Sequence, residues 1–310
     1  MTDVLQLKYR PKTLVDVVGQ EQIVAALQST IKRGSSHAFL FSGPSGCGKT
    51  TLARIVASSV GCTQRDVLEV DAATYTGIDD VRALTATLAY KPLGDSRVRA
   101  LIIDECHALS KQAWQSLLKI VEEPPAWVYW FFCTTEASRV PETIKTRCSR
   151  FDVREVPWKI LASDLLTPVA RAEKLKASAD VISLCAKEAK GSPRQALVNL
   201  AVCADVTDSD DAAELMASAA QSAEAVDLAR ALMKGESWDR LAAIIKALQG
   251  SDPESVRQVV RAYATTVALG TSGAKVPMRA LAILDAFSTP MSRSDGVSPL
   301  LLAVGALILG

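Results

Sequence analysis

Lys49 and Thr50 close a stretch, 43–50, that matches the phosphate-binding pattern G-x-x-x-x-G-K-[ST]. In this pattern the glycines let backbone N–H groups face phosphate oxygens, the lysine adds a positive charge, and the last hydroxyl can bind Mg²⁺. An apolar run, 38–41, precedes the loop and a helical pattern, 52–57, follows it, which argues against a chance turn. The predicted phosphate and nucleotide contacts of this loop are Gly43, Pro44, Ser45, Gly46, Cys47, Gly48, Lys49, Thr50 and Thr51.

Two carboxylates, Asp104 and Glu105, end another apolar run, 98–103. At the C-terminal end of a buried strand, one carboxylate can hold Mg²⁺ and the other can polarise a water molecule. Taken alone, a strand that ends in Asp-Glu is commonly just a solvated edge. Downstream of a phosphate loop it is the expected second half of an ATPase site, so we assign Asp104 to the metal and Glu105 to the attacking water.

Apolar segments near residues 38–41, 66–71, 98–105, 128–135 and 151–156 alternate with helical patterns such as 111–122. This alternation predicts a parallel, doubly wound sheet with helices on both faces. Ligands of such sheets lie beyond the carboxyl ends of the strands, where Lys49, Asp104, Glu105 and Thr135 would gather.

The chain beyond Pro157 has helical patterns throughout. Gly191 stops one predicted helix, and Ser192 and Pro193 begin the next with a cap and a first-turn proline. An Asp/Ser-rich stretch, 207–211, marks another break. The sequence therefore predicts a nucleotide-binding domain over 1–157, a small helical domain over 158–206 and an all-α domain over 207–310.

Composition excludes little about partners, because 310 residues with a net charge of +1 give no general attraction to a polyanion. Seven scattered cysteines without a Cys-x-x-Cys pair indicate neither disulfides nor zinc, so we expect a reducing cytoplasm. No secretory signal is apparent at the start of the sequence. The apolar run 300–309 is shorter than the ~20 residues that span a bilayer, so we expect a buried helix and no membrane partner.

The phosphate loop, the Asp-Glu pair at 104–105, a Glu-Glu-Pro-Pro helix end at 122–125 and an Arg-Cys motif at 147–148 occur in one chain. With these motifs, residues 7–200 resemble the clamp-loader branch of the AAA+ ATPases, most closely the tau/gamma subunits of bacterial DNA polymerase III. The Glu-Glu-Pro-Pro helix end at 122–125 and the Arg-Cys motif at 147–148 are narrower signals than the phosphate loop, which many ATPases share. The last hundred residues match only in being helical and would correspond to the oligomerising collar. The matching motifs lie at 8–11, 18–21, 43–50, 71–73, 77–82, 104–110, 117–125, 146–148 and 191–194.

The resemblance implies ATP and Mg²⁺ as cofactors, with Thr50 and Asp104 at the metal. It implies that Thr135 is a sensor, that Arg194 reaches the γ-phosphate from the helical lid, and that Arg147 is a finger offered to a neighbouring subunit. The open alternative for Arg147 is that it only pairs with a carboxylate of its own chain. The residues that would flank the base and sugar are Lys8, Tyr9 and Val18; for this N-terminal segment, a role in merely covering the core is the open alternative.

Two departures from the family are present. In the family, a four-cysteine zinc module lies between the phosphate loop and the motif that corresponds to 71–73. Here this interval contains only one cysteine, Cys62, so we expect no zinc. The usual Ser-Arg-Cys is replaced by 146–148, Thr-Arg-Cys, which keeps Arg147. A compact loader of this kind could belong to a virus, so the expected location is the bacterial cytoplasm or, for a virus, the host cytoplasm.

The function implied is an ATPase that opens a sliding clamp and loads it on primer-template DNA within a pentameric ring, and so serves the replicative polymerase indirectly. One alternative is another AAA+ motor, of the kind that migrates Holliday junctions, and a second is a non-hydrolysing scaffold subunit of the ring. Arg82 and Lys111, at the starts of two predicted helices, are candidates for DNA contact. Solvated surface charge is the competing interpretation for both.

Overall fold

A computed structural model describes residues 4–74, 77–88, 90–92, 96–270 and 278–309 of the chain. The chain divides into two units, 1–212 and 213–310, with the boundary inside the long helix α11 (Ser209–Lys234). The sequence-based division into three domains at residues 157 and 206 stays a prediction.

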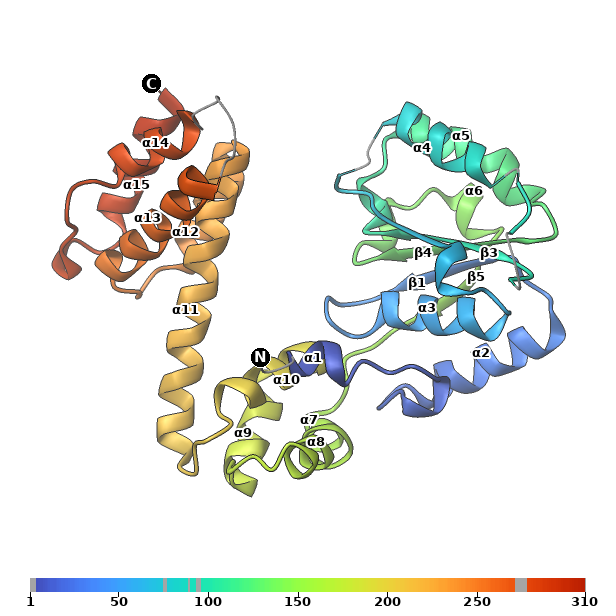
Figure 1. Cartoon of the computed structure of the whole chain (residues 1–310), viewed down its shortest axis with the longest axis horizontal. Coiled ribbons are helices and arrows are strands. Elements are labelled where there is room, and N and C mark those ends of the chain that lie inside the picture. The colour runs from blue at the N-terminus through green and yellow to red at the C-terminus, as the bar shows by residue number, and fades with distance from the viewer. Residues whose placement is uncertain (1–3, 75–76, 89, 93–95, 271–277, 310) are drawn as a thin grey trace. The chain divides into compact units, whose positions relative to one another are not determined.

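Within its described residues, the first unit contains one parallel sheet of five strands, as the sequence predicts (Figure 1). Across the sheet the order is β2 (Val67–Asp71), β3 (Arg99–Asp104), β4 (Val128–Thr134), β1 (Ala38–Ser42) and β5 (Ser149–Asp152). Since β1 lies between β4 and β5, the loop that follows β1 opens beside the ends of both neighbours.

Helices cover both faces of this sheet, which confirms the predicted doubly wound arrangement (Figure 1). In β4, Trp130 and Phe132 pack against the side of α4 (Ile78–Thr87), α5 (Lys111–Glu122) and α6 (Glu142–Lys145). Phe131 and Cys133 pack against the side of α2 (Glu21–Arg33) and α3 (Lys49–Ser59). Alternate side chains of a strand point to opposite faces, so a central strand covered on both sides is apolar throughout.

The fifth strand ends earlier than the predicted 151–156. The Val153 N–H still donates to the Ser42 carbonyl at 2.7 Å, but beyond it the chain leaves the sheet. The backbone of Arg154 bonds the side chain of Gln20, and the Val156 N–H donates to the Gly191 carbonyl at 2.9 Å. The predicted end was wrong because these hydrogen bonds come from distant parts of the sequence.

Helices follow the sheet as predicted: α7 (Trp158–Ile160), a π-helical turn (Leu161–Leu166), α8 (Thr167–Ala172), α9 (Ala179–Glu188) and α10 (Pro193–Val202). The Ser192 hydroxyl caps α10 by accepting from the Gln195 N–H at 3.2 Å. Near the N-terminus, α1 (Leu5–Lys8) packs against α10.

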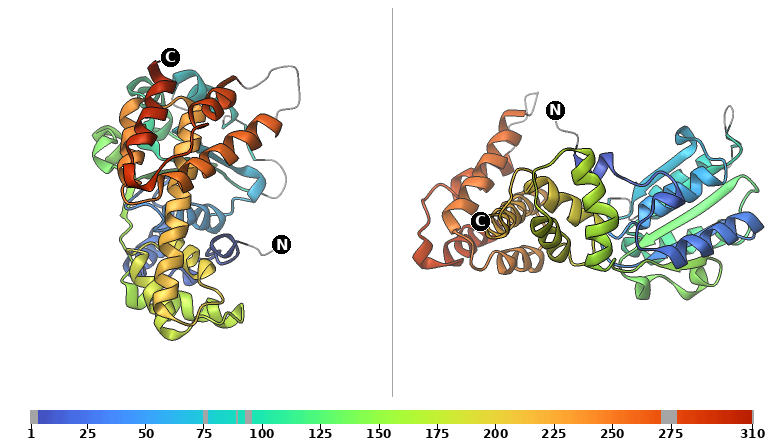
Figure 2. Two further views of the ribbon diagram at one scale, coloured as in Figure 1. Left: turned by 90° about the vertical axis from the view of Figure 1, so that its left-hand side faces the viewer. Right: turned by 90° about the horizontal axis from the view of Figure 1, so that it is seen from below.

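Within residues 213–270 and 278–309, the second unit contains helices and no strand: its α-helices are joined by loops that include a short 3-10 helix, η6 (Arg293–Asp295). Besides the C-terminal part of α11, which Figure 2 shows as one continuous helix, it contains α12 (Trp238–Ala247), α13 (Pro253–Gly270), α14 (Met278–Ala286) and α15 (Ser298–Leu309). The apolar run at 300–309 forms α15, with Leu300 and Val304 in the core but Leu302 exposed. Within the described residues, no helix is both long and apolar enough to cross a membrane.

Glu254 joins the start of α13 to the segment after α14. It accepts hydrogen bonds from Arg257 Nε at 2.7 Å and from the Met291 N–H at 2.9 Å. Arg257 in turn donates to the Phe287 carbonyl at 3.1 Å. The Arg257 guanidinium and then the Met291 N–H lower the pKa of Glu254 from 4.5 to about 2, because both stabilise the ionised carboxylate.

We expect this carboxylate to make the second unit less stable in acid. A carboxyl group whose pKa is lower in the folded state stabilises the fold above its unfolded pKa, here near 4.5, and the stabilisation is lost as the pH falls through about 2. The urea midpoint of the wild type should therefore fall more steeply between pH values of about 5 and about 2.5 than that of Glu254→Gln. Circular dichroism measures both.

Asp227→Asn is the matched control, because it removes another (i, i+3) pair of the same unit, the exposed pair with Arg230 at 3.3 Å. Its midpoint should follow the wild-type pH dependence. Equal slopes for the wild type and Glu254→Gln would contradict the assignment.

Candidate nucleotide-binding site

The phosphate loop follows β1 and is bonded to β4. The Gly43 N–H donates to the Thr134 carbonyl at 3.2 Å, and α3 begins at Lys49. Gly43, Gly46 and Gly48 all have positive φ, at 143°, 75° and 101°, a region that side chains rarely enter. The loop therefore turns back over the N-terminus of α3, which favours an anion.

The Lys49 side chain reaches back across this loop. Its Nζ donates to the carbonyls of Gly43 at 2.9 Å and Pro44 at 3.0 Å, and the residue is only 6% exposed. A buried ammonium needs such partners, and they keep its charge at the loop.

Thr50 and Asp104 lie together at the start of α3 and the end of β3. The Thr50 hydroxyl donates to Asp104 Oδ2 at 2.8 Å, while Asp104 Oδ1 accepts from the Glu105 N–H at 3.1 Å. A hydroxyl and a carboxylate are the hard oxygen donors that Mg²⁺ takes together with phosphate oxygens. These two residues fit the metal that the sequence assigns to them.

Glu105 has a left-handed backbone, with φ 45° and ψ 42°, which is uncommon outside glycine. Its Oε2 accepts from the Thr135 hydroxyl at 3.2 Å. The structure thus brings together the side chains assigned to the attacking water and to the sensor.

A pocket opens between the phosphate loop, the N-terminal segment and α10. Its lining includes three of the predicted residues, Tyr9, Val18 and Arg194. Lys8 instead forms an ion pair with Glu173 at 2.7 Å, and the Tyr9 hydroxyl donates a hydrogen bond to the same carboxylate. Sequence reasoning missed several of the lining residues. They are Gln6, Arg10, Pro11, Asp16, Leu52, Leu165, Pro193 and Leu197.

Arg10 and Arg194 line this pocket, and Arg54, which pairs with Glu69, lies near enough to act on Arg10. Burial lowers the pKa of the Arg10 guanidinium, and the charges of Arg54 and Arg194 lower it further. The Arg194 N–H lies 3.4 Å from the Gly46 carbonyl, so α10 begins directly against the phosphate loop. Such a cluster suits a polyphosphate.

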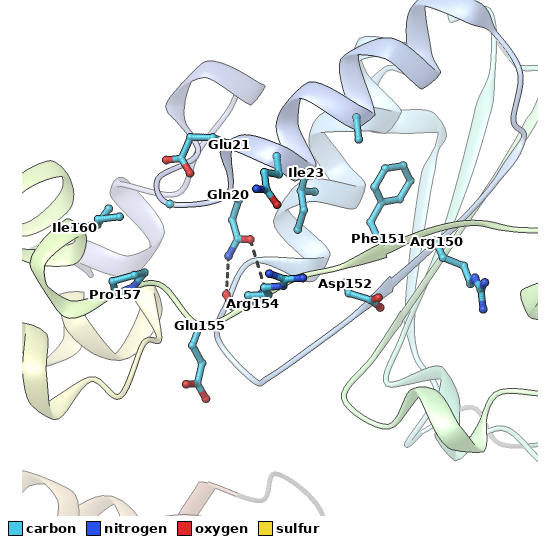
Figure 3. A pocket seen from close by; sticks show the side chains of 13 residues that line it. Gln20, Glu21, Ile23, Arg150, Phe151, Asp152, Arg154, Glu155, Pro157 and Ile160 are labelled. Atoms are coloured by element: carbon cyan, nitrogen blue, oxygen red, sulfur yellow. Dashed lines mark hydrogen bonds between the residues drawn. The ribbon is translucent and has the colours of Figure 1, made fainter.

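A second pocket lies on the other side of the N-terminal segment, between the start of α2, β5 and the chain leading to α7 (Figure 3). Gln20 bridges it through Nε2, which donates to the Arg154 carbonyl at 2.6 Å. Its lining includes no residue assigned to the nucleotide, so the nucleotide assignment belongs to the pocket beside Gly46 and Arg194.

Arg147 forms local contacts in this chain. Its Nη2 bonds Glu122 Oε1 at 2.8 Å and its Nη1 donates to the Thr143 carbonyl at 2.7 Å. The finger role stays a prediction.

The two candidates for DNA contact lie on the surface. Arg82 is exposed and pairs with Asp79 at 3.4 Å, and Lys111 is exposed at the start of α5. Their role in binding DNA also stays a prediction.

No group of three or more His, Cys, Asp or Glu side chains that could hold a metal occurs within the part of the chain that the structure describes.

Comparison with known proteins was made on sequence and on structure. Residues 66–157 match the family described as DNA polymerase III, delta subunit, and residues 13–96 match magnesium chelatase, subunit ChlI. The DNA polymerase III subunit gamma/tau of Mycobacterium tuberculosis is 37% identical over 217 residues, 62% of this chain and 37% of the relative. The tau subunit of Bacillus subtilis is 33% identical over 272 residues, 79% of this chain and 48% of the relative.

Among solved structures, the Holliday junction branch migration motor RuvB of Thermotoga maritima aligns with a TM-score of 0.56 and 21% identity, over 84% of this chain and 91% of that one. The chain therefore has the fold of an AAA+ domain, a parallel α/β sheet domain with a phosphate loop, followed by helices. It resembles the gamma/tau subunits of DNA polymerase III, and it spans between about a third and a half of the length of the relatives cited.

We expect Gly43→Ala to displace the phosphate loop. A Cβ at Gly43 would lie 2.0 Å from the Val153 carbonyl oxygen, which belongs to the backbone and cannot rotate away. Strain of this kind costs about 1–3 kcal/mol, so the affinity for ATP should fall by about tenfold or more. Titration with a fluorescent ATP analogue measures the affinity.

Gly34→Ala is the control, since Gly34 also has positive φ, 61°, but a Cβ there meets nothing within 4 Å. It should cost about 1 kcal/mol of stability and leave ATP affinity unchanged. Wild-type affinity in Gly43→Ala would show that the contact with Val153 does not shape the loop.

Proposed function

We propose that this chain binds ATP with Mg²⁺ and hydrolyses it. The observation that carries the proposal is the 2.8 Å hydrogen bond between Thr50 and Asp104, directly beside Lys49 and Glu105. Lys49 would neutralise phosphate charge, Thr50 and Asp104 would hold the metal, and Glu105 would orient the water that attacks the γ-phosphorus as ADP leaves. Bound Mg²⁺ would neutralise the charge that develops on the phosphates.

We further propose that ATP drives a clamp-loading cycle in DNA replication. The support is the similarity to gamma/tau subunits of DNA polymerase III, which extends over 79% of this chain for the Bacillus subtilis tau subunit. In this proposal the chain forms a pentameric ring with other loader subunits, opens a sliding clamp on ATP binding, and releases it around primer-template DNA on hydrolysis.

The alternative of a Holliday-junction motor is supported by the similarity of fold to the RuvB motor of Thermotoga maritima, with which this chain shares 21% sequence identity. The higher sequence identity to gamma/tau subunits, 33–37%, favours the loader. A non-hydrolysing scaffold is disfavoured because the side chains that hydrolysis needs are present and adjacent, as the Thr135 to Glu105 hydrogen bond at 3.2 Å illustrates.

Glu105→Gln tests the hydrolysis step. If this carboxylate orients the water, kcat should fall by about 10²-fold or more while ATP affinity stays near that of the wild type. Steady-state phosphate release with clamp and primed DNA measures kcat, and an ATP-analogue titration measures affinity. Lys49→Ala is the contrasting variant, since it should lose affinity itself. Equal turnover in the wild type and Glu105→Gln would remove the assignment.

Arg147 can be tested for action across a subunit interface. An arginine supplied to a phosphoryl-transfer site is worth about 10³-fold or more in rate, so Arg147→Ala should bind ATP but turn it over slowly. Mixed with Lys49→Ala, which keeps the arginine, it should regain part of the clamp-stimulated activity. Recovery no greater than the sum of the two separate variants, in rings shown to be mixed by differently tagged subunits, would mean that Arg147 does not act across the interface.

A further inference from the structure

His107 lies next to the assigned catalytic carboxylate, and the proposed mechanism does not use it. It belongs to the short helix η3 (Cys106–Ala108), which begins directly after Glu105. Its side chain is 15% exposed. The imidazole is therefore largely enclosed at the carboxyl ends of β3 and β4.

The imidazole contacts residues from both of these strand ends. Its Nδ1 lies 3.0 Å from the Thr134 hydroxyl and 3.4 Å from Glu105 Oε2. Its Nε2 lies 3.4 Å from Glu136 Oε1, a carboxylate that also pairs with Arg139 at 3.3 Å. One ring thus links the catalytic carboxylate to the segment that carries the sensor.

Thr134 gives this ring a fixed anchor. The residue is fully buried, its hydroxyl accepts from the Glu136 N–H at 2.9 Å, and its carbonyl accepts from the Gly43 N–H of the phosphate loop at 3.2 Å. A ring held by such an anchor has little freedom to move.

The carboxylate of Glu105, by contrast, is 36% exposed and needs restraint. His107 and the Thr135 hydroxyl both contact its Oε2. The Thr135 hydroxyl donates to this oxygen and the imidazole Nδ1 lies against it, so the two groups together restrict how the carboxylate can turn.

His37 shows what a purely structural histidine looks like in this chain, which has two histidines in all. Its ring stacks on Tyr129 with centroids 4.6 Å apart, and its Nδ1 lies 3.1 Å from the Val128 carbonyl. Those contacts lie at the opposite end of β4 from Glu105, whereas the contacts of His107 converge on it.

We propose that His107 is a positioning residue for ATP hydrolysis, holding Glu105 Oε2 against the buried end of β4 so that the second oxygen faces the attacking water. This rests on the proposed ATPase function. Placing a reacting group wrongly by about 1 Å can cost about 10²-fold in rate, so the effect should appear in kcat and not in ATP affinity.

His107→Ala and His107→Asn form the test pair. The alanine variant should lower kcat by about tenfold or more and leave the Kd for ATP within about twofold of the wild type. Asparagine can place an amide near the position of Nδ1, so it should keep kcat within about threefold of the wild type. Phosphate release with clamp and primed DNA gives kcat, and analogue titration gives Kd.

A double variant shows whether the effect passes through Glu105. In a Glu105→Gln background, adding His107→Ala should lower the residual kcat by less than about twofold, because the two residues act as a unit. A full additional tenfold loss would overturn the proposal. Wild-type kcat in His107→Ala, equal losses in the alanine and asparagine variants, or a loss of ATP affinity that accounts for the loss of rate would overturn it as well.

The contact itself has a readout that needs no hydrolysis. With two histidines, proton NMR should show two Cε1–H signals, and the one missing from His107→Asn is that of His107. Glu105→Gln should shift this signal and leave that of His37 in place, and an unmoved His107 signal would overturn the proposal. If the signal shifts but the wild type hydrolyses no ATP, the proposed function fails while the contact is supported.

Discussion

The hydrogen bond between Thr50 and Asp104 is the interaction on which the geometry of the candidate site depends. It joins the first turn of α3 to the last residue of β3, across a sheet in which β4 lies between β1 and β3. Because α3 begins where the phosphate loop ends, this one bond fixes the loop relative to the carboxylates. The Gly43 to Thr134 bond does the same for β4, so three elements meet at one edge of the sheet.

That edge exists because the strands are parallel and buried on both faces. Parallel strands bring all their carboxyl ends to one side, where polar residues can follow an apolar strand without entering the core. Phe131 and Phe132 point to opposite faces of β4, and Thr134 is its first polar residue after Tyr129. Packing of the apolar side chains therefore determines the position of each strand. The polar residues that follow the strands then lie close together at one edge of the sheet.

The parallel sheet and the neighbourhood of Thr50, Asp104 and Glu105 could be predicted from the sequence, because strand and helix periodicity and loop motifs are local signals. What could not be predicted depends on contacts between distant residues. Glu173 binds both Lys8 and Tyr9, and it lies 164 residues after Tyr9 in the sequence. Nothing in either segment of the sequence specifies this partner. The end of β5 could not be predicted for the same reason, because the side chain of Gln20 forms a hydrogen bond with the backbone of Arg154.

The local pairing of Arg147 does not oppose a role at a neighbouring subunit. Glu122 is 55% exposed and Arg147 31% exposed, and a pair of such exposure contributes about 0–1 kcal/mol to stability. The Arg147 Nε is buried without a hydrogen-bond partner in the described part of the chain, so the guanidinium is incompletely satisfied where it lies. If Arg147 acts at a neighbouring subunit as proposed, a γ-phosphate there would offer it charge-assisted hydrogen bonds, which are stronger than those of an exposed ion pair. The weak pair with Glu122 would therefore be a small obstacle to that exchange. The carboxylate would hold the arginine ready until a nucleotide-bound neighbour arrives.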